Sequence, residues 1–180
     1  MNHENQPQSI KFPAIGTEIQ SMIEIDQAMR IKALSDPAFW DETVDRQHTE
    51  RMKHIVSEIG WPTISKVGLE SSYDAWLLVQ HADEDLDFQI ACLELMKEAG
   101  LGEVDILNIV YLADRTQVNQ NLGQLYGTQF TEINNQHVPK LIEDETNIDK
   151  RRESVGLGPM SEQIEQMNIK YPLNHVSDSK

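Results

Sequence analysis

The chain of 180 residues has little of several features that define common protein classes. It contains one cysteine, Cys92, so no internal disulfide can form. It has 15 lysines and arginines against 30 aspartates and glutamates, and its net charge of -15 disfavours binding to nucleic acid or to an anionic membrane surface. No apolar run approaches the roughly 20 residues that a membrane span needs, and the first residues lack the pattern of a secretory signal. We therefore expect a cytoplasmic protein without nucleic-acid or membrane partners.

Familiar catalytic and metal-binding motifs are also missing. The sequence has no H-E-x-x-H, G-x-S-x-G, P-loop or G-x-G-x-x-G pattern. His48 and His54 are six residues apart on a charged segment, which is off the spacing of two ligands on one helix face, so we expect both to be solvated. A zinc site on His81 and Asp83 would lack further ligands. Cys92 follows an apolar helical pattern and is predicted to be a core residue. We expect no metal and no cofactor.

The remaining pattern predicts an all-α fold, in one compact multi-helix domain. Apolar residues make up 39% of the chain, which is enough to build a core. Helices are expected at residues 17–34, 45–59, 70–82, 83–99, 103–117, 147–154 and 161–168, with a short one near 63. No alternating pattern is long enough for a sheet. Residues 119–137 are expected to form a short irregular loop region, in which Gly123 and Gly127 permit turns or a short extended piece. The helical domain is placed at 17–171, with a flexible arm at 1–16 and a flexible tail at 172–180.

Two charged residues interrupt the apolar stripe of the first expected helix. Asp26 and Arg30 fall in the middle of this stripe and are four residues apart, so they can pair. Two interpretations are open: a structural ion pair under the core, or a pair that lines a pocket.

Further polar residues end or interrupt other apolar segments. Gln80 and His81 close the stretch 73–79, and each has a structural and a functional interpretation. Gln89 lies on the apolar face of its helix, where it either braces a neighbouring helix or reaches into a site. Asp114 and Arg115 close the stretch 106–113, where they either tether a loop or hold a base and bind a carboxylate.

A polar loop follows the helix that ends near residue 117. It carries Tyr126, Thr128 and Gln129, and Gly127 permits a turn between them. The two nearly all-apolar helices should both be central, and each has its polar cluster at its C-terminal end. We therefore predict that six of these side chains converge on one cavity: Gln80, His81, Asp114, Arg115, Tyr126 and Gln129.

The order of these motifs resembles a bacterial family of uncharacterised domains. The resemblance rests on Gly60-Trp61-Pro62, Gln80-His81-Ala82-Asp83, Leu112-Ala113-Asp114-Arg115 and Gln124-Leu125-Tyr126-Gly127-Thr128-Gln129, and it extends from about residue 18 to 166. Asp26, Arg30, Gln89, Arg151 and Arg152 belong to the same series. The resemblance implies one composite polar site and names no chemistry.

The first functional hypothesis is an enzyme that acts on a small molecule or peptide as a hydrolase or lyase. His81 would be the general acid or base, oriented by Asp114 or Asp26. Arg30, Arg115 and Arg152 would bind a small anionic molecule or peptide. Gln80, Gln89, Tyr126, Thr128 and Gln129 would contribute further substrate contacts. The alternative is a non-enzymatic acidic binding protein, for instance an immunity or inhibitor protein for a basic partner.

Overall fold

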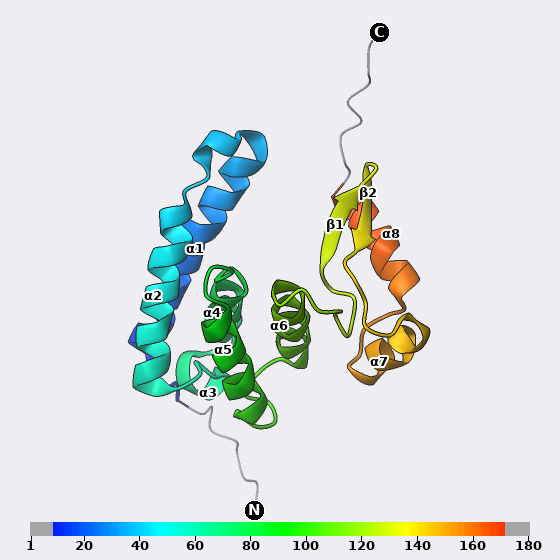
Figure 1. Cartoon of the computed structure of the whole chain (residues 1–180). Helices are drawn as coiled ribbons and strands as arrows, with labels where there is room; N and C mark the ends of the chain where they lie inside the picture. The colour runs from blue at the N-terminus through cyan, green and yellow to red at the C-terminus, as the bar shows by residue number, and fades with distance from the viewer. Residues whose placement is uncertain (1–8, 172–180) are drawn as a thin grey trace, which may run out of the picture. The chain divides into compact units, whose positions relative to one another are not determined.

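The computed structural model describes residues 9–171 and is mostly helical, with eight α-helices in that range (Figure 1). The prediction of an all-α fold is confirmed, and the described residues contain one two-stranded sheet. The chain divides into two compact units, residues 1–109 and 110–180. The tail expected at 172–180 and the first half of the expected arm lie outside the described residues. The domain boundaries stay a prediction.

The first unit begins with a hairpin of two long helices. Helix α1 (Pro13–Ser35) starts four residues before the expected Thr17 because a proline is well suited to the first helical position. Residues 13–16 are therefore helix, although we expected them to belong to the N-terminal arm. After the short 3-10 helix η1 (Pro37–Phe39), α2 (Glu42–Ile59) begins where the Asp41 side chain accepts a hydrogen bond from the Thr43 N–H.

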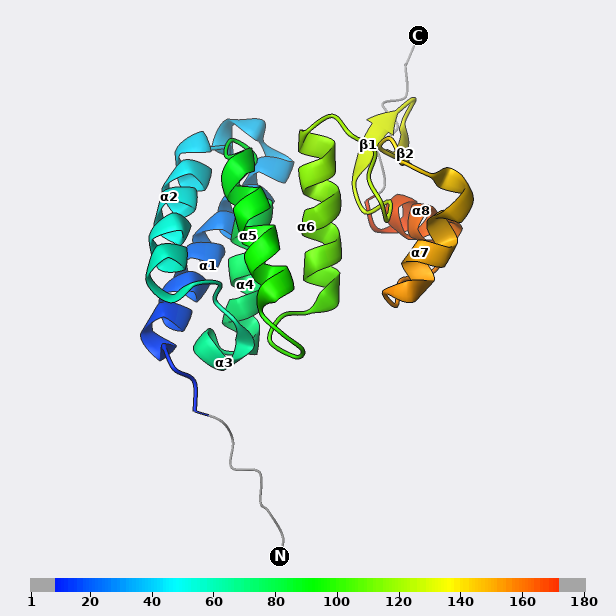
Figure 2. The same cartoon turned by 60° about the horizontal axis from the view of Figure 1, so that its bottom comes forward.

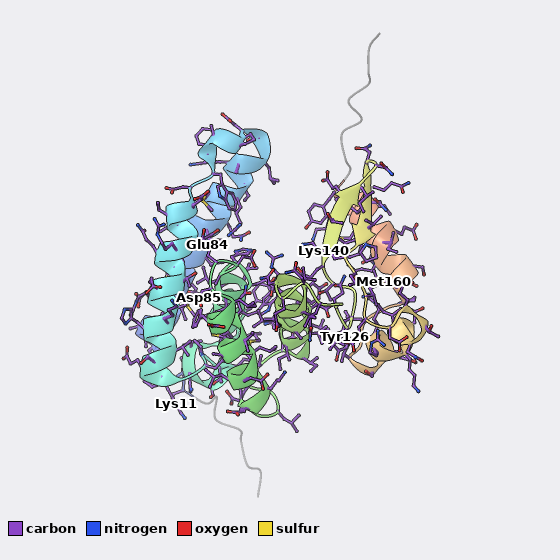
Figure 3. All side chains as sticks on the ribbon, in the orientation of Figure 1. Lys11, Glu84, Asp85, Tyr126, Lys140 and Met160 are labelled. Atoms are coloured by element: carbon purple, nitrogen blue, oxygen red, sulfur yellow. The ribbon has the colours of Figure 1, made fainter. Side chains whose placement is uncertain are left out.

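Three shorter helices complete the packing of this unit. They are α3 (Ile64–Val67), α4 (Leu69–Gln80) and α5 (Leu86–Glu98). Helix α4 packs against α1, α2, α3 and α5, which makes it the central element (Figure 2). Glu84 and Asp85 lie in the turn between α4 and α5 (Figure 3), where Asp85 caps α5 and also pairs with Nζ of Lys53 at 2.5 Å. The core of this unit includes the buried side chains Ile19, Met52, Ile55, Val79 and Met96.

Helix α6 (Ile106–Asn119) carries the chain from the first unit into the second. There, β1 (Phe130–Ile133) and β2 (Gln136–Pro139) form an antiparallel hairpin. Asn134 and Asn135 connect the strands with φ of 51° and 61°, the positive values that a tight two-residue hairpin turn requires. The hairpin begins inside the segment that we expected to be irregular, where a short extended piece was allowed but the pairing of two strands was not predicted.

The rest of the second unit is helical. It contains the 3-10 helix η2 (Glu145–Asn147), α7 (Ile148–Ser154) and α8 (Met160–Lys170). Helix α8 packs against β2 and against α7. Across residues 9–171, no helix combines the length and the apolar character needed to cross a membrane.

Candidate functional site

Asp26 is the centre of a polar cluster in the first unit. Its residue is fully buried on α1, with 0% exposure. The carboxylate accepts hydrogen bonds from Nε of Arg30 at 3.0 and 3.1 Å and from Nε2 of Gln27 at 2.8 Å. Nδ1 of His81, the residue that follows α4, lies 3.1 Å from the same carboxylate. Asp26 and Arg30 therefore pair as their spacing indicates, and His81 joins them from a distant part of the sequence.

The charge of Asp26 determines which nitrogen of His81 carries hydrogen. Burial raises the pKa of Asp26, but the hydrogen bonds from His81 and Arg30 outweigh this effect and hold the pKa well below its ordinary value. The carboxylate is therefore ionised and can only accept hydrogen bonds, so Nδ1 of His81 must be the donor. In the neutral imidazole, Nε2 is then the nitrogen without hydrogen. The His81 side chain is 18% exposed.

Arg30 holds two carboxylates at once. Its Nη2 lies 2.6 Å from Oδ1 of Asp45 on α2, and its guanidinium lies 5.0 Å from the centroid of the Trp40 ring. Burial raises the pKa of Asp45, and the charge of Asp26 acts in the same direction while Arg30 opposes it. One guanidinium thus fixes Asp26 and Asp45 across the α1–α2 hairpin.

His48 on α2 extends this cluster. It is half-buried, and its Nδ1 is buried without a hydrogen-bond partner among residues 9–171. Burial lowers the pKa of His48, although the charges of Asp26 and Asp45 oppose the shift. The expectation that His48 is solvated is wrong, because its side chain lies on the side of α2 that faces Asp26 and Arg30 of α1. His54 is exposed as expected.

Gln89 braces the end of α4. It is fully buried, and its Nε2 donates to the main-chain carbonyls of Val79 and Gln80 at 3.1 and 3.4 Å and to Oδ1 of Asp83 at 3.3 Å. These bonds fix the turn that presents His81. The Gln80 side chain is itself buried, at 8% exposure. Of the two interpretations of Gln89, this geometry favours bracing.

In the second unit, Asp114 clamps the loop that follows α6. Its fully buried carboxylate accepts the main-chain N–H groups of Leu125 at 2.7 Å, Tyr126 at 3.0 and 3.2 Å, and Thr128 at 2.9 Å. Both oxygens are engaged by the backbone. Within this unit Asp114 shapes the loop, and a role in orienting His81, a residue of the first unit, stays a prediction.

Glutamine side chains complete the loop. Gln129 accepts a bond from Nη1 of Arg115 at 3.1 Å and donates to Oγ1 of Thr128 at 3.0 Å. The fully buried Gln124 donates to the carbonyls of Gln129 and Lys140, both at 2.9 Å, and accepts from the Gln129 N–H at 2.8 Å. The amide of Gln124 therefore replaces backbone pairing inside the loop.

Arg152 fastens the same loop from α7. It is 1% exposed, and all three of its guanidinium nitrogens donate hydrogen bonds. They donate to the main-chain carbonyls of Gly158 and Tyr126, both at 2.6 Å, and to Oε1 of Gln163 at 3.2 Å. Burial lowers the pKa of Arg152. This arrangement supports a structural role, whereas we expected Arg152 to bind substrate.

The predicted site residues thus form two sets. The first unit holds Asp26, Arg30, Gln80, His81 and Gln89. The second unit holds Asp114, Arg115, Tyr126, Thr128, Gln129 and Arg152. The convergence of six of them on one cavity stays a prediction.

Sequence reasoning missed four neighbours of Asp26 and Arg30. They are Gln27, Trp40, Asp45 and His48. A signal for Asp45 was present: Arg30 lies seven residues before Pro37, and Asp45 lies seven residues after Ala38. In an antiparallel helix hairpin that turns at Pro37 and Ala38, such positions lie side by side.

Other reactive groups contribute little to this site. Burial raises the pKa of Cys92 to about 12, so its thiol stays protonated, as expected of a core residue. Among residues 9–171, no three histidine, cysteine, aspartate or glutamate side chains are grouped to hold a metal ion.

The fold and the site define a mostly helical protein with a buried aspartate between a histidine and an arginine. The chain belongs to the family of unknown function DUF6624, which matches residues 13–176. No curated protein and no solved structure matches the chain.

Proposed function

We propose that the protein is an enzyme that uses His81 as a general acid or base on a small molecule or peptide. The contact between Nδ1 of His81 and the ionised carboxylate of Asp26 carries this proposal. An aspartate in this position fixes the imidazole orientation and tautomer, and it stabilises the imidazolium that forms when Nε2 accepts a proton.

The surrounding contacts support the same role. Arg30 and Gln27 hold the carboxylate of Asp26 from two further directions, and Asp45 holds Arg30. Gln89 fixes the main chain just before His81. A base whose orientation is set by several bonds needs little reorganisation when the reaction occurs.

The chemistry proposed is proton transfer without a covalent enzyme intermediate. The only thiol is buried and protonated. His81 Nε2 would remove a proton from a water molecule or from a carbon next to a carbonyl group, and would then return it to the leaving group. These two reactions correspond to a hydrolase and a lyase. The expectation that the substrate is a small anionic molecule or peptide stays a prediction.

A metabolite screen with matched variants tests this proposal. The full chain is incubated with a mixture of esters, amides, dipeptides and hydroxy acids, and the compounds consumed are identified by mass spectrometry. His81→Asn should lower the turnover of any substrate by about 10²- to 10⁴-fold, the usual contribution of a general acid or base. His54→Asn, which changes an exposed histidine, should retain full turnover. Equal turnover by His81→Asn and the wild type would remove His81 from the reaction.

Asp26 requires a different measurement because it acts through His81. Asp26→Asn should lower kcat much more than it changes KM, since the carboxylate orients the base and does not touch the substrate. A ¹⁵N spectrum of the imidazole should show hydrogen on Nδ1 of neutral His81 in the wild type. A neutral His81 with hydrogen on Nε2 would contradict the proposed geometry.

A second function, an acidic protein that binds a basic partner, has its own support. The loop residues of the second unit form a closed network around Asp114 and Arg152, as structural clamps do. The net charge of -15 would attract a basic protein. Under this alternative, a purified basic partner should bind with strong salt dependence, and His81→Asn should bind it as tightly as the wild type.

A further inference from the structure

A pocket with a cavity volume of about 450 Å³ lies in the first unit, where α4 and α6 begin. Its size falls within the range of small-molecule sites, roughly 300–1,000 Å³. It is lined in part by the N-terminal turns of α4, whereas His81 follows the other end of that helix. The pocket is therefore distinct from the cluster around Asp26.

The lining of this pocket carries negative charge and no positive charge. Three carboxylates line it, those of Glu70, Asp74 and Asp105, and no lysine, arginine or histidine does. Within residues 9–171, Glu70 and Asp74 have no hydrogen-bond or ion-pair partner. They are four residues apart on one helix face, where like charges repel. Burial raises the pKa of Asp74, and the charge of Glu70 raises it further.

Two buried neutral groups also line the pocket without partners. Ser72 is 4% exposed and Asn108 is 6% exposed. Neither side chain makes a hydrogen bond within the part of the chain that the structure describes. Buried polar groups normally have partners, so these two oxygens are available to accept N–H groups from a ligand.

We propose that this pocket binds a small organic cation with a primary ammonium group, in the class of linear diamines and polyamines. The ammonium pairs with Glu70 and Asp74, and its N–H groups satisfy Ser72 and Asn108. The Tyr73 ring also lines the pocket and is 48% exposed, so it offers an aromatic face to the cation and its alkyl chain. An anionic ligand would be repelled by the carboxylates, and a quaternary ammonium has no N–H to donate.

Calorimetric titration of the full chain with putrescine and spermidine tests this proposal, with tetramethylammonium as the comparison probe. The wild type should bind one polyamine per chain with a Kd below about 1 mM. Losing one charge-assisted contact in Asp74→Asn or Glu70→Gln should weaken binding about tenfold or more. Glu98→Gln removes an exposed carboxylate on α5, and His81→Asn changes the separate cluster, so both should bind like the wild type.

Several results would overturn the proposal. One is the absence of binding by the wild type at millimolar polyamine. Another is equal weakening by Glu98→Gln and Asp74→Asn, which would show that only the overall negative charge attracts the cation. Tetramethylammonium that binds as tightly as putrescine would remove the roles of Ser72 and Asn108. Because Glu70 is exposed, Glu70→Gln should fold normally even if Asp74→Asn does not. Loss of binding in His81→Asn would mean that the pocket is not independent of the proposed catalytic cluster.

Discussion

Nδ1 of His81 lies 3.1 Å from Oδ1 of Asp26, although 55 positions separate the two residues in the chain. The contact joins α1 to the end of α4, the central helix of the first unit. Because Asp26 is fully buried and also bonded to Arg30, the contact lies within the core and contributes to folding as well as to any chemistry of His81.

Asp26→Asn should destabilise the first unit. The substitution removes the charge that His81 and Arg30 share and leaves Arg30 with Asp45 alone. Breaking a buried ion pair on one side typically costs about 3–5 kcal/mol. The free energy of unfolding, measured by urea denaturation, should fall by this amount. Glu98→Gln serves as the control and should unfold like the wild type, and an unchanged Asp26→Asn would mean that the pair contributes nothing.

The Asp26 carboxylate makes the stability of the folded protein depend on pH, and the sign of this dependence follows from its lowered pKa. The pKa of Asp26 is lower in the folded protein than in the unfolded chain, so the unfolded chain binds its proton first. The stabilisation is therefore complete above about pH 4, the ordinary range of an aspartate, and is lost as the pH falls further. Between pH 6 and 3, the free energy of unfolding should change less with pH in Asp26→Asn than in the wild type. Parallel curves for the two proteins would contradict the lowered pKa of Asp26.

His48→Gln should reduce the loss of stability between pH 7 and pH 5. Burial lowers the pKa of His48, so the unfolded chain takes up a proton near pH 6.5 that the folded protein resists. The neutral His48 therefore costs no stability above about pH 6.5, and the folded protein loses stability as the pH falls below this value. Urea midpoints at the two pH values measure the effect, with the exposed His54→Gln as control. A steeper loss in His48→Gln than in the wild type would reverse the expected sign.

The sequence was most informative about helices and individual polar residues. Asp36-Pro37 and Gly60 ended the first two helices as expected, because they disfavour helix continuation. Asp26 stood out because a charge in an apolar stripe needs a partner. A short extended piece was expected in this region, but the pairing of two strands was not, because Asn134-Asn135 is a weaker turn signal than Asn-Gly and each strand has only four residues.

The partners of the polar residues were harder to predict. Asp114 bonds to main-chain N–H groups, which every residue except proline has, so nothing in the side chains of the loop identifies the contact. His48 was misread because its exposure depends on the neighbouring helix and not on the polarity of its own. Helix periodicity defines the face of a residue, but not what covers that face.

Asp114→Asn should loosen the loop at residues 125–128. It places an amide donor among main-chain N–H donors and leaves at least one of them without an acceptor. We expect a loss of about 2–4 kcal/mol in unfolding free energy, because hydrogen bonds to buried charged groups are worth about 1.5–3 kcal/mol each. Hydrogen exchange should become faster in the N–H groups of Leu125, Tyr126 and Thr128. Glu132→Gln on the exposed face of β1 is the control, and unchanged protection in Asp114→Asn would reject the clamp.

Gly127→Ala should destabilise the second unit through both backbone and packing. Gly127 has a φ of 70°, and an added Cβ would lie 2.5 Å from Sδ of Met160 and 3.1 Å from Cδ1 of Ile148, both buried side chains (Figure 3 labels Met160). The left-handed backbone costs about 1–2 kcal/mol for alanine, and overpacking adds about 1–3 kcal/mol. Thermal or urea unfolding measures the sum.

A matched glycine and a second substitution separate these two costs. Gly100 also has a positive φ, of 89°, but an added Cβ there meets nothing within 4 Å, so Gly100→Ala should show the backbone cost alone. Met160→Ala should relieve the packing cost, so that the double variant with Gly127→Ala is more stable than the sum of the single effects predicts, by about 0.5–3 kcal/mol. Two results together would contradict this prediction: additive changes in unfolding free energy in the double variant, and equal changes in Gly100→Ala and Gly127→Ala. They would show that Met160 moves aside and that the close approach of the loop to α8 does not require glycine.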